Sequence, residues 1–435
     1  MVSADPLSLT VDQAVDLAVK NNLVLKGEDL QLQAKQRSKD YAWNAFIPKT
    51  SASTALAHLN QPSSLYSTFA QIFPQYNFSS PAWTLAASFS SQLNISLALF
   101  DGIRHTVFDY EAGVIEASAA KQKLVRDTKK AFYNLLLLKA DIDTFSDHVE
   151  TAGKHYEKEK KNFESGVGSE FSMLNAQVEW ENLKPGLDEM KIAEAVAELT
   201  FKQTLGIDQN QELHILGSFD VPSAPLDRDH LITQAINNNP SLASIRQAIR
   251  IQKNLRQGQF DLSYLPVLGL SYTADPAFQK DPFSNPLFAN INRDWVQSNG
   301  MFSVYLSLPL DGYLPFSSTA ITLANMDTGV AQMENNLLIA IQGEQVQVTS
   351  LFMQIEKSRR SIDRLELNVN LASRAYQMAE RGFESGAYEL LQVEDADSKL
   401  REARLNVLSE RYAYLSGLFD LEYETNQTLT VKSNE

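Results

Sequence analysis

The sequence contains no cysteine, which excludes disulfide bonds, thiolate metal sites and thiol nucleophiles. A chain without thiols fits an oxidising compartment, in which stray cysteines are a liability. No uninterrupted apolar run approaches the length of about 18 residues that a transmembrane helix needs. Basic residues are also few: 38 Lys and Arg stand against 53 Asp and Glu, a formal net charge of −15. This charge argues against nucleic acid as a partner, because phosphate binding needs clustered Lys and Arg.

Signatures of catalysis are missing as well. The sequence has no phosphate-binding loop, nucleophile elbow, HExxH motif or dinucleotide fingerprint. His148 and His155 share a helix face, but they lie two turns apart, which is too far for one metal ion. The other histidines show no ligand spacing: His58, His105, His214 and His230. We therefore predict that the protein is not an enzyme and holds no metal and no cofactor.

The first ten residues, MVSADPLSLT, have neither the basic region nor the apolar region of a signal peptide. If the protein is exported, we expect its signal peptide to be absent from this sequence. The composition is that of a soluble protein. A β-barrel membrane protein would have the same composition, because its strands alternate between apolar and polar residues.

The tetrapeptide Phe-Glu-Ser-Gly occurs twice, at 163–166 and at 383–386. Before each copy, apolar residues recur at alternating spacings of three and four, and Tyr, Ala, Val and Ile follow in the same order. A period of 3.5 residues is typical of coiled coils. The pattern predicts two copies of one long helix, at about 103–163 and about 317–383.

Other segments recur at nearly the same offset. The pairs are LTVDQAVDLAVKNN (9–22) with LDRDHLITQAINNN (226–239), NAFIPKTSAS (44–53) with LSYLPVLGLS (262–271), and SLALFDG (96–102) with SLPLDG (307–312). The chain is therefore predicted to consist of two structural repeats, 1–206 and 226–435. The segment between them, 207–225, contains Gly and Pro residues that break the periodicity.

Each repeat is predicted to contain two helices, a strand, a loop, a second strand, the long helix, a glycine turn and a returning helix. The strands are expected at about 50–60, 83–99, 266–274 and 300–310, and the returning helices at about 170–205 and 387–418. Asp101 and Asp311 each precede a glycine and are expected to act as N-caps of the long helices. Pro185 is expected to kink or interrupt the first returning helix.

The second strand of each repeat alternates between apolar and polar residues. Trp83, Leu85, Ala87, Phe89, Leu93, Ile95, Leu97 and Leu99 share one face, as do Phe302, Val304, Leu306, Leu308 and Leu310. This pattern suits tilted strands that cross the apolar band of an outer membrane, about 25 Å tall. The segments between paired strands, 67–83 and 275–295, are rich in Pro and aromatic residues. Trp83 and Trp295 are expected in an interfacial aromatic girdle.

Four strands cannot close a barrel, and an open sheet edge cannot face lipid because its backbone groups would lack partners. Three chains would supply twelve strands, an even number, as such barrels require. The alternatives are a soluble sandwich or a plain coiled-coil rod, as in a non-pore periplasmic or surface scaffold or antigen. A scaffold has no use for the one-sided apolar face of 83–99 and 302–310.

The ordered set of segments, present twice, resembles the TolC family of outer-membrane channel proteins. The resemblance implies a mainly α fold with a small β part, built from two tandem helix-helix-strand-strand-long helix-helix repeats. It implies a homotrimer in the bacterial outer membrane, with a twelve-stranded β-barrel and an α-barrel that extends into the periplasm. A mixed equatorial region would come from 1–25, 205–240 and the tail after about 418. The protein would passively conduct substrates in a tripartite efflux or type I secretion system, powered through a periplasmic adaptor and an inner-membrane pump.

The resemblance also implies roles for particular residues. The tips of the two hairpins would be adaptor-docking candidates, namely Phe163, Ser165, Gly166, Gly168, Phe383, Ser385 and Gly386. Family members often carry two Asp three residues apart after the second turn, at the periplasmic entrance. Asp395 falls on the second of these positions and Gln392 on the first, so that Glu394 and Asp397 remain as compensating candidates. The alternative is that these acids form a solvated face near a helix N-terminus, where they suit the dipole.

Overall fold

The computed structural model describes residues 7–58, 60, 64–75, 83–221, 225–274, 277–278, 300–385 and 387–429. The contacts divide the chain into two units. The first contains Met1–Gln33, Ala112–Arg246 and Asn335–Glu435, and the second contains Ala34–Glu111 and Gln247–Glu334. Each unit therefore draws on both of the predicted repeats. None of the helices in the described ranges combines the length and the apolarity that crossing a membrane requires.

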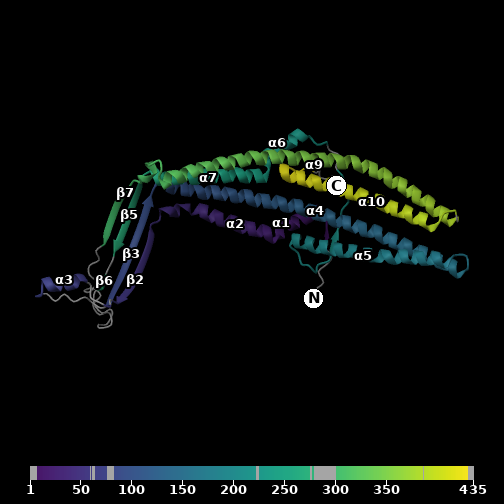
Figure 1. Ribbon diagram of the computed structural model, residues 1–435, viewed down its shortest axis with the longest axis horizontal. Coiled ribbons are helices and arrows are strands. Elements are labelled where there is room, and N and C mark those ends of the chain that lie inside the picture. The colour runs from purple at the N-terminus through teal and green to yellow at the C-terminus, as the bar shows by residue number, and fades with distance from the viewer. Residues whose placement is uncertain are drawn as a thin grey trace. The chain divides into compact units, whose positions relative to one another are not determined.

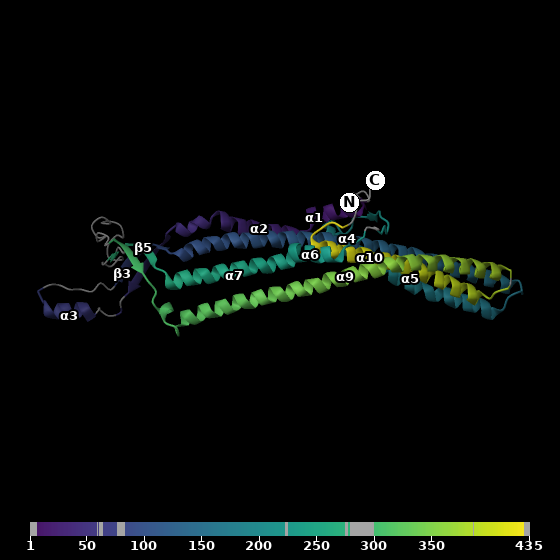
Figure 2. The same cartoon turned by 90° about the horizontal axis from the view of Figure 1, so that it is seen from above.

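The second unit is built around an antiparallel sheet (Figures 1 and 2). Its long strands are β2 (Lys49–His58), β3 (Trp83–Ile95), β5 (Val267–Ala274) and β7 (Met301–Ser307). They lie in the order β2-β3-β5-β7, and the short β6 (Ala277–Phe278) pairs with β3. The central pairing of β3 with β5 joins the two predicted repeats inside one sheet. The α-helix α3 (Ser64–Ile72) was not predicted and reaches into the segment expected to be a loop.

The strand predicted over 83–99 is too long. β3 ends at Ile95, and α4 (Leu97–Glu164) begins at Leu97 rather than at 103. Asp101 is therefore not an N-cap: it lies inside α4, is 5% exposed, and its Oδ1 accepts a hydrogen bond from Arg104 at 3.3 Å. Leu97 and Leu99 belong to this helix. A short apolar run of good helix formers cannot be distinguished from a strand by periodicity alone.

The second Asp-Gly pair also differs from its predicted role. Asp311 begins the short 3-10 helix η2 (Asp311–Tyr313), and α9 (Ser318–Glu384) starts after it. The N-terminus of α9 is capped by Ser317, whose Oγ accepts a hydrogen bond from the amide of Ala320 at 3.1 Å. Asp311 instead accepts a hydrogen bond from the hydroxyl of Thr319. A serine hydroxyl nearer to the helix thus replaces the carboxylate as the cap.

The register of the sheet gathers the apolar side chains on one face. Leu93 is paired with Leu270, and Leu270 with Val304. On the same face, Leu306 is 71% exposed and Phe302 is 66% exposed. Successive side chains of a strand point to opposite faces, so the other face carries the polar residues. There, Ser51 and Ser90 share a hydrogen bond of 2.7 Å, and Gln92 donates to the hydroxyl of Tyr305 at 3.1 Å.

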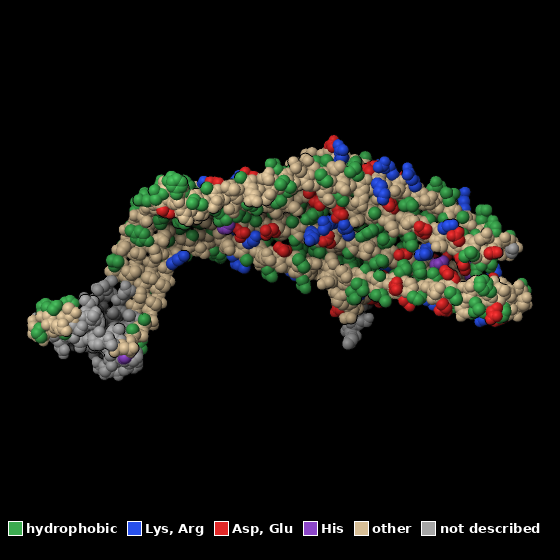
Figure 3. Space-filling view, in the orientation of Figure 1, with side chains coloured by type: hydrophobic (Ala, Val, Ile, Leu, Met, Phe, Trp, Pro, Cys, Tyr) green, Lys and Arg blue, Asp and Glu red, His purple; other side chains and the backbone are tan. Residues whose placement is uncertain are grey.

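The polar face contains hydroxyl and amide groups and almost no charge. Lys49 is the one charged residue in the four long strands, and the sheet seen in Figure 3 shows little red or blue. Gly269 lies under the ring of its cross-strand partner Tyr305, where a β-carbon would overlap the ring. The aromatic ring therefore covers backbone that glycine leaves open.

Helices complete the second unit. They include α2 (Leu23–Asp40) from Ala34 onward, the 3-10 helix η1 (Ala42–Phe46) and most of α7 (Pro240–Tyr264). The first residues of α4 and of α9 also belong to this unit. Buried polar residues of α7 repeat every seven positions at Gln247, Asn254 and Asp261. Gln247 donates to the carbonyl of Phe108 at 2.7 Å, and Asn254 donates to the carbonyl of Asp101 at 2.9 Å. Hydrogen bonds therefore fix the register of α7 against α4.

The first unit contains α1 (Val11–Asn21), α5 (Glu170–Leu205), α6 (Arg228–Asn238), α10 (Leu390–Thr425) and most of α4 and α9. β1 (Leu7–Leu9) pairs in parallel with β4 (Leu213–Ile215), so the start of the chain is bound to the segment between the repeats. One core cluster centres on Phe132, Leu135, Phe201 and Leu205. A second cluster joins α9 and α10 through Val348, Ile355, Leu415 and Leu421. α10 continues to Thr425, beyond the expected end at 418.

Pro185 does not interrupt the first returning helix. α5 runs continuously from Glu170 to Leu205 with Pro185 inside it. A β-carbon on the following Gly186 would lie 3.2 Å from Cζ of Phe145, so α5 packs closely on α4 at this point. Tertiary packing here outweighs the lost backbone hydrogen bond, which costs about 3 kcal/mol in an isolated helix.

Candidate functional site

The turn between α4 and α5 is organised around one carbonyl group. The backbone oxygen of Asn162 accepts hydrogen bonds from the amides of Val167 and Gly168, both at 2.9 Å. It also accepts one from Oγ of Ser165 at 3.0 Å. Gly166 has a φ of +76°, a conformation that costs a residue with a β-carbon about 1–2 kcal/mol. The Ser and the Gly of this first copy of the motif are thus explained by turn geometry.

The turn between α9 and α10 repeats this arrangement. The carbonyl of Gly382 accepts hydrogen bonds from the amides of Ala387 at 2.8 Å and Tyr388 at 3.2 Å. Oγ of Ser385 donates to the same carbonyl at 3.0 Å. The donors are the residues three, five and six positions later in both turns, so the sequence repeat is also a hydrogen-bond repeat. Gly386 lies outside the described residues.

The two phenylalanines of the repeat have different surroundings. Phe383 packs edge-to-face on His155, with 5.8 Å between ring centroids, and Lys158 lies 4.0 Å above its ring. This side chain therefore joins α9 to α4. Phe163 is 39% exposed at the end of α4. The sequence repeat alone did not distinguish these two roles.

Large apolar side chains lie exposed beside both turns. Val167 is 84% exposed, Phe171 is 73% exposed, and Leu391 is 70% exposed. Exposed apolar groups that cluster mark surfaces for partners more often than singly scattered ones do. These three residues were not predicted from the sequence, although their position in or just after each turn was a usable signal.

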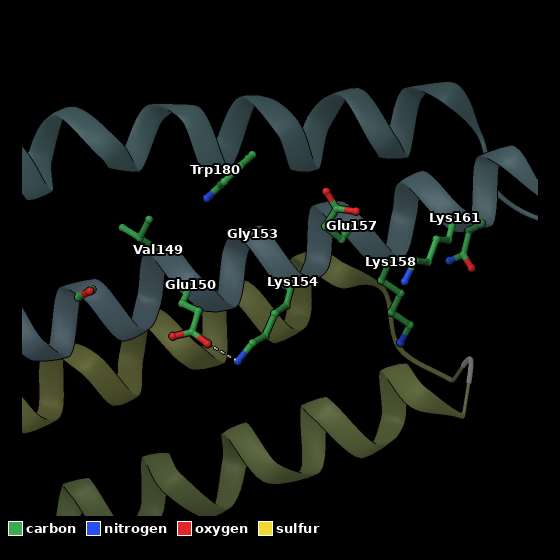
Figure 4. A pocket seen from close by; sticks show the side chains of 10 residues that line it. Val149, Glu150, Gly153, Lys154, Glu157, Lys158, Lys161 and Trp180 are labelled. Carbon is green, nitrogen blue, oxygen red and sulfur yellow. Dashed lines mark ion pairs between the residues drawn. The ribbon is translucent and has the colours of Figure 1, made fainter.

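A groove of about 760 Å³ lies along α4 beside the first turn (Figure 4). Its lining includes Lys154, Lys158 and Lys161 together with Glu150 and Glu157. Across from them, Trp180 of α5 faces Gly153, where a β-carbon would lie 3.1 Å from Nε1 of the indole. Asn162 lines this groove as well as organising the turn, so the two features are continuous.

The exposed face at the start of α10 carries Gln392 and Asp395. Oε1 of Gln392 accepts a hydrogen bond from the amide of Glu389 at 3.2 Å, so this side chain caps the helix. Asp395 pairs with Lys399 at 2.6 Å, and both side chains are more than half exposed, 61% and 67%. Such exposed pairs contribute about 0–1 kcal/mol, so the Asp395 carboxylate stays available to a partner or an ion.

Glu394 and Asp397 have different surroundings from Asp395. Burial raises the pKa of Glu394, and the nearby Glu179 carboxylate raises it further, while His148 acts in the opposite direction. Asp397 pairs with Nδ1 of His148 at 2.5 Å. These two acids therefore interact with groups on α4 and α5 and do not extend the exposed face that holds Asp395.

The structure does not describe the side chains of the two residues predicted to form an interfacial aromatic girdle, Trp83 and Trp295. Trp83 begins β3, and its side chain lies outside the described part of the structure. Trp295 lies outside the described residues altogether.

Comparisons with known proteins agree on one family. The model of the outer membrane efflux protein family matches residues 14–204 and again 231–422. The outer membrane protein TolC of Vibrio cholerae serotype O1 is 23% identical over 312 residues, which are 70% of this chain and 68% of that protein. The fold is similar to the Campylobacter jejuni CmeC outer membrane channel, with a TM-score of 0.75 at 15% identity over 98% of this chain and 87% of that chain. CusC is similar at a TM-score of 0.74 and 15% identity, over 95% and 91% of the two chains.

Proposed function

The chain belongs to the outer membrane efflux protein family, and on this premise we propose that it forms the trimeric exit channel of a tripartite efflux or type I secretion system. In this proposal, substrates pass from the periplasm to the exterior without energy input from the channel itself. A periplasmic adaptor and an inner-membrane pump supply the energy. The partners are two further copies of the chain, the adaptor, the pump and outer-membrane lipid, with no nucleic acid.

The observation that carries the proposal is that both outer edges of the sheet formed by the four long strands are unpaired within the described residues. Within the described residues, β2 pairs with β3 alone and β7 pairs with β5 alone, so each has an open outer edge. Every neighbour in the order β2-β3-β5-β7 is antiparallel, so β2 and β7 run in opposite directions. β7 of one copy can therefore extend β2 of the next with the same antiparallel pairing. Three copies supply twelve strands and leave no edge.

The two faces of the sheet support the same assembly. Leu306, Phe302 and Val304 are 71%, 66% and 59% exposed, an arrangement that is unfavourable against water at about 25 cal/mol per Å². Lipid around the barrel would cover this face. The opposite face, with its hydroxyl and amide groups, suits a water-filled interior. This one-sided apolar surface also counts against a non-pore scaffold.

The helices of the first unit present exposed heptad stripes. On α5, Phe171, Val178, Ile192 and Leu199 follow at multiples of seven and are 73%, 58%, 65% and 47% exposed. On α9, Ile339, Val346, Met353 and Leu367 do the same and are 58%, 70%, 59% and 59% exposed. A heptad stripe is stable when a partner helix covers it. In the proposed trimer, helices of neighbouring copies cover these stripes.

The hairpin ends are proposed as the adaptor-docking surface. The surface combines the exposed apolar residues at the turns, such as Val167 and Leu391, with the charged groove along α4. Asp395 is proposed to line the entrance, where three copies of its carboxylate would attract cations and disfavour anions.

Engineered cysteines test the assembly without background, because the chain has none of its own. Ser53 of β2 and Ser303 of β7 both lie on the polar face, on the two outer strands. In membranes, oxidation of the Ser53→Cys/Ser303→Cys protein should give covalent trimers. The Ser51→Cys/Ser303→Cys protein, whose first cysteine lies two residues earlier on the same face of β2, tests the neighbouring alignment of the two strands. Light scattering of the detergent-extracted protein should give the mass of three chains.

The matched control replaces Ser53→Cys by Ser88→Cys. Ser88 is the cross-strand partner of Ser53 but belongs to the inner strand β3, so it should give no intermolecular crosslink. A water-soluble monomer, or equal crosslinking from Ser88→Cys, would refute the proposed barrel.

A further inference from the structure

The α1–α2 and α6–α7 junctions are each built on one asparagine, Asn22 and Asn239. Both residues are buried, at 7% and 1% exposed. In each, Oδ1 accepts hydrogen bonds from the backbone amides two and three positions later, at 2.8–3.2 Å. The backbone amide of each asparagine donates to the carbonyl four positions earlier at 2.9 Å. In both repeats, one asparagine therefore ends one helix and caps the next.

The side-chain amide nitrogens of the two asparagines have different partners. Nδ2 of Asn22 donates to the backbone carbonyl of Thr204 at 2.9 Å. Nδ2 of Asn239 donates to Oε2 of Glu424 at 2.6 Å. Thr204 and Glu424 are equivalent, because each is the second-last residue of its returning helix, α5 or α10. The first junction is thus bound to a carbonyl that does not titrate, and the second to a carboxyl group that does.

A second carboxyl group, that of Glu344 on α9, lies beside this contact. Its Oε1 is buried and accepts no hydrogen bond from the described residues, which disfavours the ionised form. Burial, and then the charge of Glu424, raise the pKa of Glu344 from 4.5 to about 7, against the influence of Asn239. Burial also raises the pKa of Glu424, again against Asn239. The site is therefore more stable with a proton on Glu344 than with two negative charges.

The charged groups around the two carboxyl groups give little compensation. Arg126 of α4 lowers the pKa of Glu424, and Asp420 of α10 raises it. Arg126 lies 2.7 Å from Asp127 and 3.7 Å from Asp420, so its positive charge is shared among acids. On α7, Arg246 donates to a backbone carbonyl of α6 at 2.7 Å. A second negative charge beside Glu424 would therefore repel the first with little screening.

We propose that the α6–α7 junction is a proton-sensitive joint, and that the α1–α2 junction is its proton-insensitive equivalent. With Glu344 protonated, Asn239 stays bound to Glu424 and the start of α7 is fixed. When Glu344 ionises, repulsion between the two carboxylates opens this contact and releases the start of α7. Asn239 and Glu344 are positioning residues, and this joint is a property of one chain that does not require the channel function proposed above.

The direction of the pH response follows from the proton on Glu344. The closed joint binds this proton more tightly than the open joint does, because burial beside Glu424 raises the pKa of Glu344. The stability of the closed joint is therefore fully present below about pH 4.5 and is lost as pH rises through about 7.

Hydrogen exchange compares the two junctions within one molecule. In the full chain extracted in detergent, exchange of residues 241–246, corrected for the intrinsic effect of pH, should be about tenfold faster at about pH 8.5 than at about pH 5.5. Tenfold is the change expected from a pKa difference of about 1, because opening restores only part of the difference between 4.5 and about 7. Residues 24–29 of α2 should show no such change. An equal response in both segments, or none in 241–246, would contradict the joint.

Two substitutions test the two carboxyl groups. Glu344→Gln keeps the shape of the protonated side chain and cannot ionise, so 241–246 should exchange slowly at both pH values. Glu424→Gln removes the repulsion but keeps an oxygen that can accept from Asn239, so it should give the same result. The matched control is Glu380→Gln, at an exposed position of the same helix α9, which should keep the wild-type response. A response that persists in Glu344→Gln, or is lost in Glu380→Gln, would overturn the joint.

Infrared difference spectra between the same two pH values follow the proton itself. A protonated carboxyl group absorbs apart from a carboxylate, so the wild type and Glu380→Gln should lose equal protonated bands as pH rises. Glu344→Gln should lose a smaller band, and an undiminished band would place the proton elsewhere and refute the joint. None of these measurements requires conduction. A protein that does not conduct, yet shows the predicted exchange and infrared changes, would contradict the channel and leave the joint standing.

Discussion

Asn162 and Gly168 share a space that holds one side chain: a β-carbon on Gly168 would lie 2.9 Å from the β-carbon of Asn162. The equivalent residues of the second turn are Gly382 and Tyr388, and there a β-carbon on Gly382 would overlap the ring of Tyr388. The two turns therefore place the glycine at opposite ends of the same residue pair. Only one residue of each pair can carry a side chain, so glycine is required at one position of the pair. It is the second position in the first turn and the first position in the second turn.

The first prediction is that this pair is coupled. Gly168→Ala should destabilise the protein by about 1–3 kcal/mol, as over-packing usually does, and lower the temperature of thermal unfolding. The same substitution should cost much less in an Asn162→Gly background, because the opposing side chain is gone. The measurement is a double-mutant cycle of these two substitutions. Additive effects would show that the residues do not compete for space.

The second prediction concerns Glu344 of α9. Burial and the neighbouring Glu424 raise its pKa from 4.5 to about 7, against a hydrogen bond from Asn239 that lowers it. The folded state therefore binds this proton more tightly than the unfolded state does. Stability that is present below about pH 4.5 is lost as pH rises to about 7.

Glu344→Gln removes this ionisation, so it should raise the unfolding temperature at pH 8 and leave it nearly unchanged at pH 4.5. The measurement is thermal unfolding between these pH values. Glu402→Gln, at an exposed position of α10, serves as the control and should not change the pH profile. A wild-type pH slope in Glu344→Gln would refute the assignment.

The third prediction tests the exposed stripe on α9. Val346 is 70% exposed, and Val346→Lys should weaken the proposed trimer in detergent because it places a charge where a partner helix is proposed to pack. The next residue, Gln347, is exposed but lies outside the heptad positions. Gln347→Lys should therefore have a smaller effect on the concentration at which the trimer dissociates. Equal effects of the two substitutions would argue that α9 has no such interface.

The fourth prediction uses the pair of Asp395 and Lys399. Asp395→Asn should weaken the block of single-channel conductance by divalent cations, because it removes the carboxylate from the proposed entrance. Lys399→Ala should strengthen the block, because it removes the cation that lies 2.6 Å from that carboxylate. A weaker block in one variant together with a stronger block in the other is a stricter test than a loss of block alone. An unchanged block in Asp395→Asn would remove this residue from the entrance.

The order of the elements could be predicted from the sequence, because periodicity reports directly on which face of an element is apolar. The family was indicated by the resemblance of the ordered set of segments. The predicted long helices ended at Phe163 and Phe383, and α4 and α9 end one residue later, at Glu164 and Glu384. Errors arose where two periods fit the same residues, as at Leu97 and Leu99. The parallel pairing of β1 with β4 escaped prediction, because three-residue strands have too little pattern to recognise.

The candidate site was less predictable than the fold. Asp395 and Asp397 are two positions apart in the sequence, and no local pattern distinguishes an exposed carboxylate from one bound to His148. That difference depends on a residue 249 positions away. The roles of Phe163 and Phe383 likewise depend on which helix lies beside each, which the heptad pattern does not specify.

The pairing of β3 with β5 has a consequence for how such a channel is put together. A chain of half the length, with the strands of one repeat, would need six copies to reach the proposed twelve strands. Every boundary between repeats would then be a contact between separate molecules. In the present chain, half of those boundaries are tethered by the polypeptide and form at a fixed effective concentration, so the proposed ring needs three contacts between separate chains in place of six.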